Sequence, residues 1–85
     1  MARVTIWHRV KNYDAWKKGY DEDKPRRDGA GIKEVSITKG NMDPNTLIIQ
    51  FDVGDPGIMQ KMFGDPDLKA KMQSAGVEAF DYYNS

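Results

Sequence analysis

The chain has 85 residues, which is the size of one small domain, and we expect residues 1–85 to form a single fold. Its 13 basic and 13 acidic residues balance to a formal net charge of 0, so the composition predicts neither a nucleic-acid nor a membrane partner. The absence of cysteine excludes disulfides, thiolate metal sites and cysteine nucleophiles. The longest aliphatic run, 47–49, cannot cross a bilayer, and the N-terminus lacks a signal-peptide pattern, so we expect a cytoplasmic protein.

The supply of core residues is small. Valine, isoleucine, leucine and phenylalanine together number 16, whereas the chain also has two tryptophans, four tyrosines and five methionines to bury. A domain of this size buries a modest share of its surface, so its stability margin is thin. This balance suggests a domain that shares part of its core with a partner subunit.

The first third of the chain predicts a strand followed by a helix. Residues 3–10 alternate between apolar and polar positions with a period of two, as in a half-buried strand. Asn12 is a suitable helix N-cap. Three aromatic residues then recur at helical spacing along one stripe: Tyr13, Trp16 and Tyr20. Pro25 should end or kink this helix, with 28–31 as a flexible exit.

The middle of the chain predicts a hairpin of strands 32–39 and 46–53 around the turn 40–45. In the first of these strands the alternation places Val35 and Ile37 on one face. On the other face it places Glu34, Ser36 and Thr38.

The last third predicts a helical segment and a final strand. The pairs Asp55-Pro56 and Asp65-Pro66 each combine a capping aspartate with a proline at the first helical position. Gly76 is a suitable C-terminal stop for the second helix. The strand 77–83 places Phe80 and Tyr82 on one face, opposite Val77, Ala79, Asp81 and Tyr83.

The resulting order, β-α-β-β-α-β, predicts a ferredoxin-like α+β fold with a four-stranded antiparallel sheet and both helices on one face. The other face would be uncovered and would carry Thr5, Trp7, Arg9, Glu34, Ser36, Thr38, Ile48, Gln50 and Asp52. We expect a second copy of the chain to cover it, in a homodimer whose interface includes Trp7, Arg9, Ile48 and Gln50. Alternatively, Trp7 and Arg9 line a second cavity with Glu34, Gln50 and Asp52.

Residues 7–21, WHRVKNYDAWKKGYD, resemble the H-x-V-x-D-Y-x-x-W-x-x-x-[YF]-D opening of small bacterial cyclase-like proteins. The similarity continues through Arg27, the turn 43–45 and the run 68–77. These proteins belong to the dimeric α+β barrel superfamily, which includes the antibiotic-biosynthesis monooxygenases. The resemblance implies a dimeric α+β barrel; its members include cofactor-independent oxygenases, isomerases, polyketide cyclases, haem-degrading enzymes and proteins without assigned activity. Asn12 replaces the usual aspartate, and both residues cap helices.

His8 is the only histidine and matches a position of that motif. It shares its strand face with Val4, Ile6 and Val10, so it should lie beneath the aromatic stripe. One interpretation is a general base, or a hydrogen-bond donor to a ligand carbonyl, in a cavity between sheet and helices. The alternative is a structural histidine bonded to a neighbouring polar group.

The aromatic stripe and the arginines admit two interpretations each. Tyr13, Trp16 and Tyr20 either wall a pocket for an aromatic ligand or only pack the core. Arg27 either binds an anionic group of a substrate or belongs to a solvated turn with the pairs Glu22–Arg26 and Asp23–Arg27.

No ligand spacing or glycine-rich loop predicts a metal or an organic cofactor. The sequence therefore favours a homodimer that binds an aromatic or polyketide-like small molecule. It would act as a cofactor-independent cyclase, isomerase or monooxygenase through His8. The alternative is a non-catalytic ligand-binding or assembly module in which the sheet face serves only for dimerisation.

Overall fold

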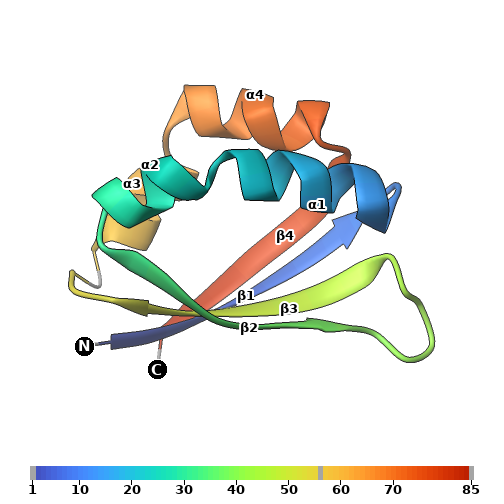
Figure 1. Cartoon of the computed structure of the whole chain (residues 1–85), viewed down its shortest axis with the longest axis horizontal. Helices are drawn as coiled ribbons and strands as arrows, with labels where there is room; N and C mark the ends of the chain where they lie inside the picture. The colour runs from blue at the N-terminus through green and yellow to red at the C-terminus, as the bar shows by residue number, and fades with distance from the viewer. Residues whose placement is uncertain (1, 56, 85) are drawn as a thin grey trace.

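The computed structural model describes residues 2–55 and 57–84 as four strands and four helices. In chain order these are β1 (Ala2–Val10), α1 (Tyr13–Glu22), α2 (Lys24–Gly29), β2 (Ile32–Lys39), β3 (Thr46–Val53), α3 (Ile58–Phe63), α4 (Pro66–Ser74) and β4 (Val77–Asn84). The strands form one antiparallel sheet in the order β2-β3-β1-β4, and the helices lie together over one face of it (Figure 1). The predicted ferredoxin-like α+β fold is thus confirmed, and the helix predicted after the first strand is divided into α1 and α2. None of the helices in the described ranges is long and apolar enough to span a membrane.

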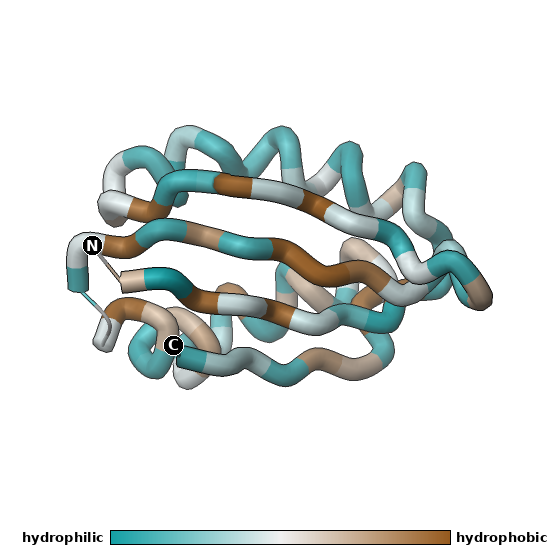
Figure 2. The backbone as a smooth tube through the Cα atoms, turned by 90° about the horizontal axis from the view of Figure 1, so that it is seen from below, coloured by the Kyte–Doolittle hydropathy of each residue, from teal (hydrophilic) through white to brown (hydrophobic). Residues whose placement is uncertain are grey.

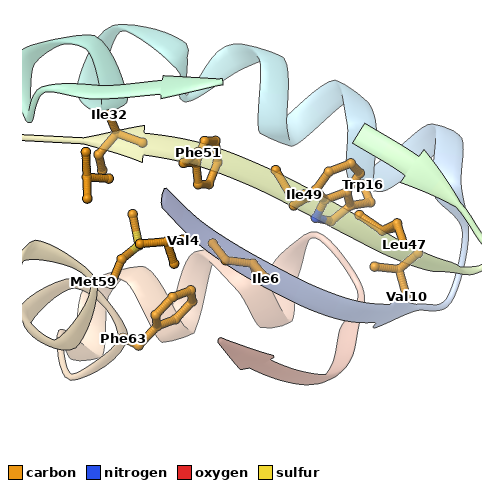
Figure 3. Packing of buried hydrophobic residues seen from close by; sticks show 11 residues of the cluster. Val4, Ile6, Val10, Trp16, Ile32, Leu47, Ile49, Phe51, Met59 and Phe63 are labelled. Carbon is orange, nitrogen blue, oxygen red and sulfur yellow. The ribbon is translucent and has the colours of Figure 1, made fainter. Parts of the chain in front are cut away.

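The central strand β1 divides the molecule into its two faces. Val4, Ile6, His8 and Val10 are buried on the helix side, as the alternation predicts. Side chains of β1 and β3 meet those of α1 and α3 in one apolar cluster (Figure 3). The cluster consists of Val4, Ile6, Val10, Trp16, Ile32, Leu47, Ile49, Phe51, Val53, Met59 and Phe63.

The first helical segment starts as predicted and breaks in the middle. The Asn12 side chain accepts a hydrogen bond of 3.0 Å from the amide of Ala15. The segment breaks at Asp23, and α2 starts at the next residue with Pro25 in its first turn, where a missing N–H costs no helical hydrogen bond. The expectation of a flexible exit at 28–31 is wrong for residues 28 and 29, which complete α2.

The second helical segment also consists of two pieces. Asp65 caps α4 by accepting a 2.9 Å hydrogen bond from the amide of Asp67, and Gly76 follows the helix with φ 86°, as predicted. The Asp55 side chain accepts from the amide of Gly57, at 2.9 Å, but α3 starts only at residue 58; Pro56 lies outside the described residues. No residue of α4 is fully buried.

A bulge in β2 overturns the predicted position of Glu34. Glu34 pairs with Phe51, whereas the next paired residue, Ser36, lies opposite Gln50. Val35 is therefore the extra residue, and the faces of the strand exchange at this point. Glu34 lies on the helix side with Phe51, not on the uncovered face, so it cannot line a second cavity there.

A similar irregularity in β4 changes the position of Val77. The register places His8 opposite Phe80 and Arg9 opposite Ala79, but Val10 opposite Val77. Glu78 is the extra residue, so Val77 lies on the helix side instead of the predicted opposite face. Phe80 and Tyr82 share one face, as predicted, and their pairing with His8 and Ile6 shows that it is the helix side. Figure 2 shows apolar and polar residues alternating along the backbone of the strands, because successive side chains lie on opposite faces of the sheet.

Candidate functional site

A cleft of about 720 Å³ opens between the sheet and the helical layer. Its floor comes from β1 and β3, and its walls come from all four helices. The residues on which its chemistry depends are His8, Trp16, Tyr20, Asp23, Arg27 and Lys71, which all line it. The volume is within the range of clefts that hold small organic molecules.

His8 is held in one orientation on the cleft floor. The residue is 6% exposed, and its Nδ1 lies 3.1 Å from the carbonyl oxygen of Trp7. The ring contacts Trp16 and Phe80 edge to face, with centroids 5.9 and 6.3 Å away. If Nδ1 carries the proton and donates to the carbonyl, Nε2 has a free lone pair.

Nε2 of His8 is accessible from the cleft. It has no hydrogen-bond partner among the described residues. Every side-chain nitrogen or oxygen of those residues that is sealed from solvent does have a partner, so Nε2 is not sealed. Burial lowers the pKa of His8 to about 4, although the bond to the Trp7 carbonyl acts in the opposite direction. The imidazole is therefore neutral at neutral pH and presents an acceptor to the cleft.

One wall of the cleft is aromatic. Trp16 stacks on Tyr20 with ring centroids 4.8 Å apart, and Tyr20 lies parallel to Phe51 at 6.4 Å. Trp16 is buried and Tyr20 is half-buried. Tyr13 contacts Trp16 at 5.9 Å but does not line the cleft; its ring lies instead beneath the Lys39 ammonium, 3.8 Å from Nζ. The wall thus includes two of the three residues of the predicted stripe.

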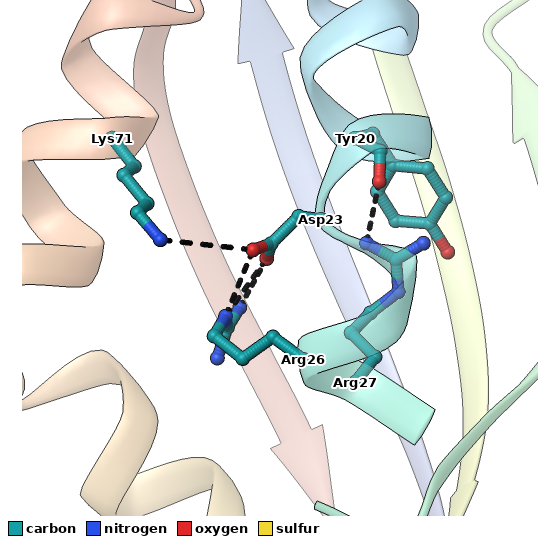
Figure 4. Close-up of polar contacts among 5 residues, drawn as sticks. All are labelled: Tyr20, Asp23, Arg26, Arg27 and Lys71. Carbon is teal, nitrogen blue, oxygen red and sulfur yellow. Dashed lines mark hydrogen bonds and ion pairs between the residues drawn. The ribbon is translucent and has the colours of Figure 1, made fainter. Parts of the chain in front are cut away.

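Arg27 is buried on the same wall without a carboxylate partner. The residue is 7% exposed; its Nη1 donates a 2.7 Å hydrogen bond to the Tyr20 carbonyl, and its Cζ lies 3.6 Å from the centre of the Tyr20 ring (Figure 4). Among the described residues it forms no ion pair. Its other guanidinium nitrogens have no hydrogen-bond partner among the described residues and are not sealed from solvent, so they can donate to a ligand.

The hydroxyl of Tyr20 points to a different group. It donates a 2.7 Å hydrogen bond to Oε1 of Glu34 on β2. Burial and this hydrogen bond raise the pKa of Tyr20, while the positive charge of Arg27 opposes the rise. The phenol is therefore neutral and is a hydrogen-bond donor throughout the physiological pH range.

An ion-pair cluster lies at the side of the cleft where α2 and α4 approach each other. The Asp23 carboxylate accepts hydrogen bonds from the Arg26 guanidinium, and Lys71 Nζ of α4 lies 3.8 Å from its Oδ1 (Figure 4). Partial burial alone would raise the pKa of Asp23, but Arg26 and Lys71 together hold it below its usual value. Neither of the predicted pairs Glu22–Arg26 and Asp23–Arg27 is among the ion pairs of the described residues. Asp23 pairs directly with Arg26, whereas Arg27 acts on it only through a Coulombic attraction that also lowers the pKa of Asp23.

The residues predicted for the dimer interface lie together on the uncovered face. Trp7 pairs with Ile48 across β1 and β3, Thr5 pairs with Gln50, and Arg9 follows on the same face. Ile48 is 36% exposed, and Trp7 is half-buried within the single chain. The face is mixed in polarity, with an Arg3–Asp52 ion pair of 2.6 Å beside these apolar side chains.

Comparison with known proteins identifies relatives by structure only. No family of known proteins matches the sequence, and neither does any curated protein. Among solved structures, candidate antibiotic biosynthesis monooxygenases match over the whole chain. One from Chloroflexus aurantiacus matches with a TM-score of 0.65 and 14% identity, over 91% of its own length. One from Deinococcus radiodurans matches with a TM-score of 0.63 and 10% identity, over 90% of its own length. A dimeric ferredoxin-like protein from an uncultured marine organism matches 98% of this chain and 84% of its own, with a TM-score of 0.59 and 17% identity.

These similarities confirm the predicted ferredoxin-like α+β fold. The chain has the ferredoxin-like α+β fold of these proteins, and at 10–17% identity the comparison reaches no further than the fold. The identity of the ligand must therefore be argued from the cleft.

Sequence reasoning missed two features of the site. The Asp23–Lys71 contact joins residues 48 positions apart, and no local pattern announces it. Glu34 was missed because a bulge has no clear sequence signal in a polar edge strand. Within 2–55 and 57–84, no group of three or more histidine, aspartate or glutamate side chains could hold a metal ion.

The burial of His8 predicts a specific pH dependence of stability. The pKa rises from about 4 in the folded chain to about 6.5 in the unfolded chain, so the unfolded chain binds the extra proton between these values. The free energy of unfolding should fall by about 3 kcal/mol as the pH drops from 6.5 to 4. The free energies of unfolding of wild type and His8→Gln, measured with urea across this pH range, isolate the contribution of His8, because the other groups titrate alike in both proteins. Equal slopes against pH would show that His8 is not buried as a neutral ring.

Proposed function

We propose that the chain forms a homodimer that binds a planar, aromatic or polyketide-like organic anion in the cleft, and that His8 acts on it as a base. The observation that supports this most is that two buried nitrogen groups line one cleft and neither forms an ion pair with a carboxylate of residues 2–55 or 57–84. These are the accessible Nε2 of His8 and the guanidinium of Arg27. Trp16 and Tyr20 supply a flat wall against which a ring can stack.

The chemistry that suits this pair is proton removal next to a carbonyl. Nε2 would take a proton from carbon, and the electron pair of that C–H bond would move to the carbonyl oxygen to give an enolate. A pKa of about 4 makes the imidazole a weak base, but one that is unprotonated at neutral pH. The negative charge that develops beside the ring would stabilise the imidazolium, and Arg27 would stabilise the anionic substrate.

Several reaction types begin with that step. Return of the proton to another atom is an isomerisation, attack of the enolate on a second carbonyl is a cyclisation, and reaction of the carbanion with oxygen is a cofactor-independent oxygenation. The alternative is a non-catalytic ligand-binding or assembly module, in which His8 only shapes the cleft. The size of the cleft supports binding under either alternative.

The dimer is proposed from the uncovered face. A ferredoxin-like protein of similar fold is described as dimeric, and the exposed Ile48 of β3 and Tyr83 of β4 would gain from burial. The half-buried Trp7 lies beside Ile48 and would supply an aromatic anchor of the kind that stabilises interfaces.

Phenylpyruvate anion tests the binding and the proton step together, because it combines an aromatic ring, a carboxylate and an enolisable CH2 group. Wild type should accelerate the exchange of its benzylic protons with D2O, followed by proton NMR at pD 7. His8→Ala should remove most of the acceleration without a large change in KM. Arg27→Met should weaken binding about tenfold or more. Arg26→Met is the matched control and should have a smaller effect, because Asp23 already neutralises that arginine.

Two outcomes would limit the proposal in different ways. Binding of phenylpyruvate without faster exchange favours the non-catalytic alternative. If His8→Ala leaves the accelerated proton exchange unchanged, His8 is excluded as the base.

The dimer is tested by light scattering at micromolar concentration. Wild type should have the mass of two chains. Trp7→Glu should shift the protein to the monomer, because a carboxylate at the centre of the face would be buried without a partner. Gln73→Glu, on the exposed side of α4, adds the same charge to the other layer and should leave the mass unchanged. A wild-type mass of one chain would exclude the dimer.

A further inference from the structure

Tyr20 is in contact with two opposite charges at the same time. The Arg27 guanidinium lies over the face of its ring, 3.6 Å from the centre, and the Glu34 carboxylate accepts a hydrogen bond from its hydroxyl at 2.7 Å. The two charges are therefore separated by little more than one phenol ring. Even so, Arg27 and Glu34 form no ion pair.

The separation is not imposed by burial of Glu34, which is exposed to solvent. A buried guanidinium is stabilised strongly by a carboxylate, and a glutamate side chain is flexible enough to move several ångströms. Glu34 reaches this side of the sheet only because of the bulge at Val35. Without the bulge it would face the uncovered side, far from Arg27.

The ring itself cannot easily move to let the charges meet. It is stacked on Trp16, at 4.8 Å, on the cleft wall and lies parallel to Phe51 at 6.4 Å. The hydroxyl therefore stays at a fixed position, and Figure 4 shows it extending away from Asp23 and Arg26. A carboxylate bound to this hydroxyl is held at the end of the ring instead of over its face.

We propose that the Tyr20 hydroxyl holds Glu34 away from Arg27 and so keeps the guanidinium available for the anionic group of the ligand. Tyr20 and Glu34 are then specificity-determining residues that act through Arg27. The ligand class is a planar carboxylate or enolate, and a neutral analogue of the same shape would lose the contact. This inference rests on the proposed function, because it presupposes that Arg27 binds an anion in the cleft.

The test uses 2-naphthoate and its neutral isostere 2-naphthamide in isothermal titration calorimetry. Four proteins are compared: wild type, Tyr20→Phe, Glu34→Gln and the double variant. Wild type should bind 2-naphthoate more tightly than 2-naphthamide. Tyr20→Phe should weaken 2-naphthoate binding about fivefold, because the released Glu34 can pair with Arg27. Glu34→Gln alone should bind 2-naphthoate within about twofold of wild type.

The double variant decides the question. It should bind 2-naphthoate as Glu34→Gln does, because an amide cannot neutralise Arg27, and the affinity for 2-naphthamide should be the same in all four proteins. A loss of affinity for both probes in Tyr20→Phe, or an equal loss with and without Glu34, would overturn the proposal by showing that the hydroxyl acts only on the shape of the cleft. Equal binding of the two probes by wild type would overturn the anion-binding function itself. Thermal unfolding of each variant confirms that the proteins compared are folded.

Discussion

The site depends on the cost of removing two nitrogen-rich side chains from water. His8 and Arg27 are buried on the helix side of the sheet, at 6% and 7% exposure, and among the described residues neither has a carboxylate within ion-pair distance. The imidazole meets this cost by staying neutral, since burial lowers its pKa to about 4. The guanidinium cannot lose its proton and instead relies on the Tyr20 carbonyl and ring. An organic anion would offset much of what remains.

The fold follows from local patterns that the sequence displays openly. The alternation of β1 predicts which side chains face the helices, and Asn12, Asp65 and Gly76 mark helix ends by hydrogen-bonding and backbone preferences that are nearly independent of context. These features place His8 and the aromatic stripe on the correct side of the sheet without any knowledge of tertiary contacts.

The details of the site were harder to predict because they depend on single-residue irregularities and on distant contacts. One extra residue, Val35, exchanges the faces of β2 and brings Glu34 to Tyr20; another, Glu78, turns Val77 inward. The break at Asp23 starts the short helix that carries Arg27 beneath Tyr20. Tyr13 and Tyr20 belong to the same stripe, yet only Tyr20 lines the cleft. The ring of Tyr13, at the first residue of α1, contacts Lys39 instead.

Nitrogen-15 NMR measures whether the His8 imidazole is neutral and which of its ring nitrogens carries the proton. Because the chain has one histidine, its ring signals need no assignment by mutation. We expect a proton on Nδ1 and none on Nε2 at pH 7, with titration only near pH 4, and a shift of the Nε2 signal when phenylpyruvate is added. A ring that titrates near pH 6.5 and does not respond to that anion would contradict the buried base on which the proposed chemistry rests.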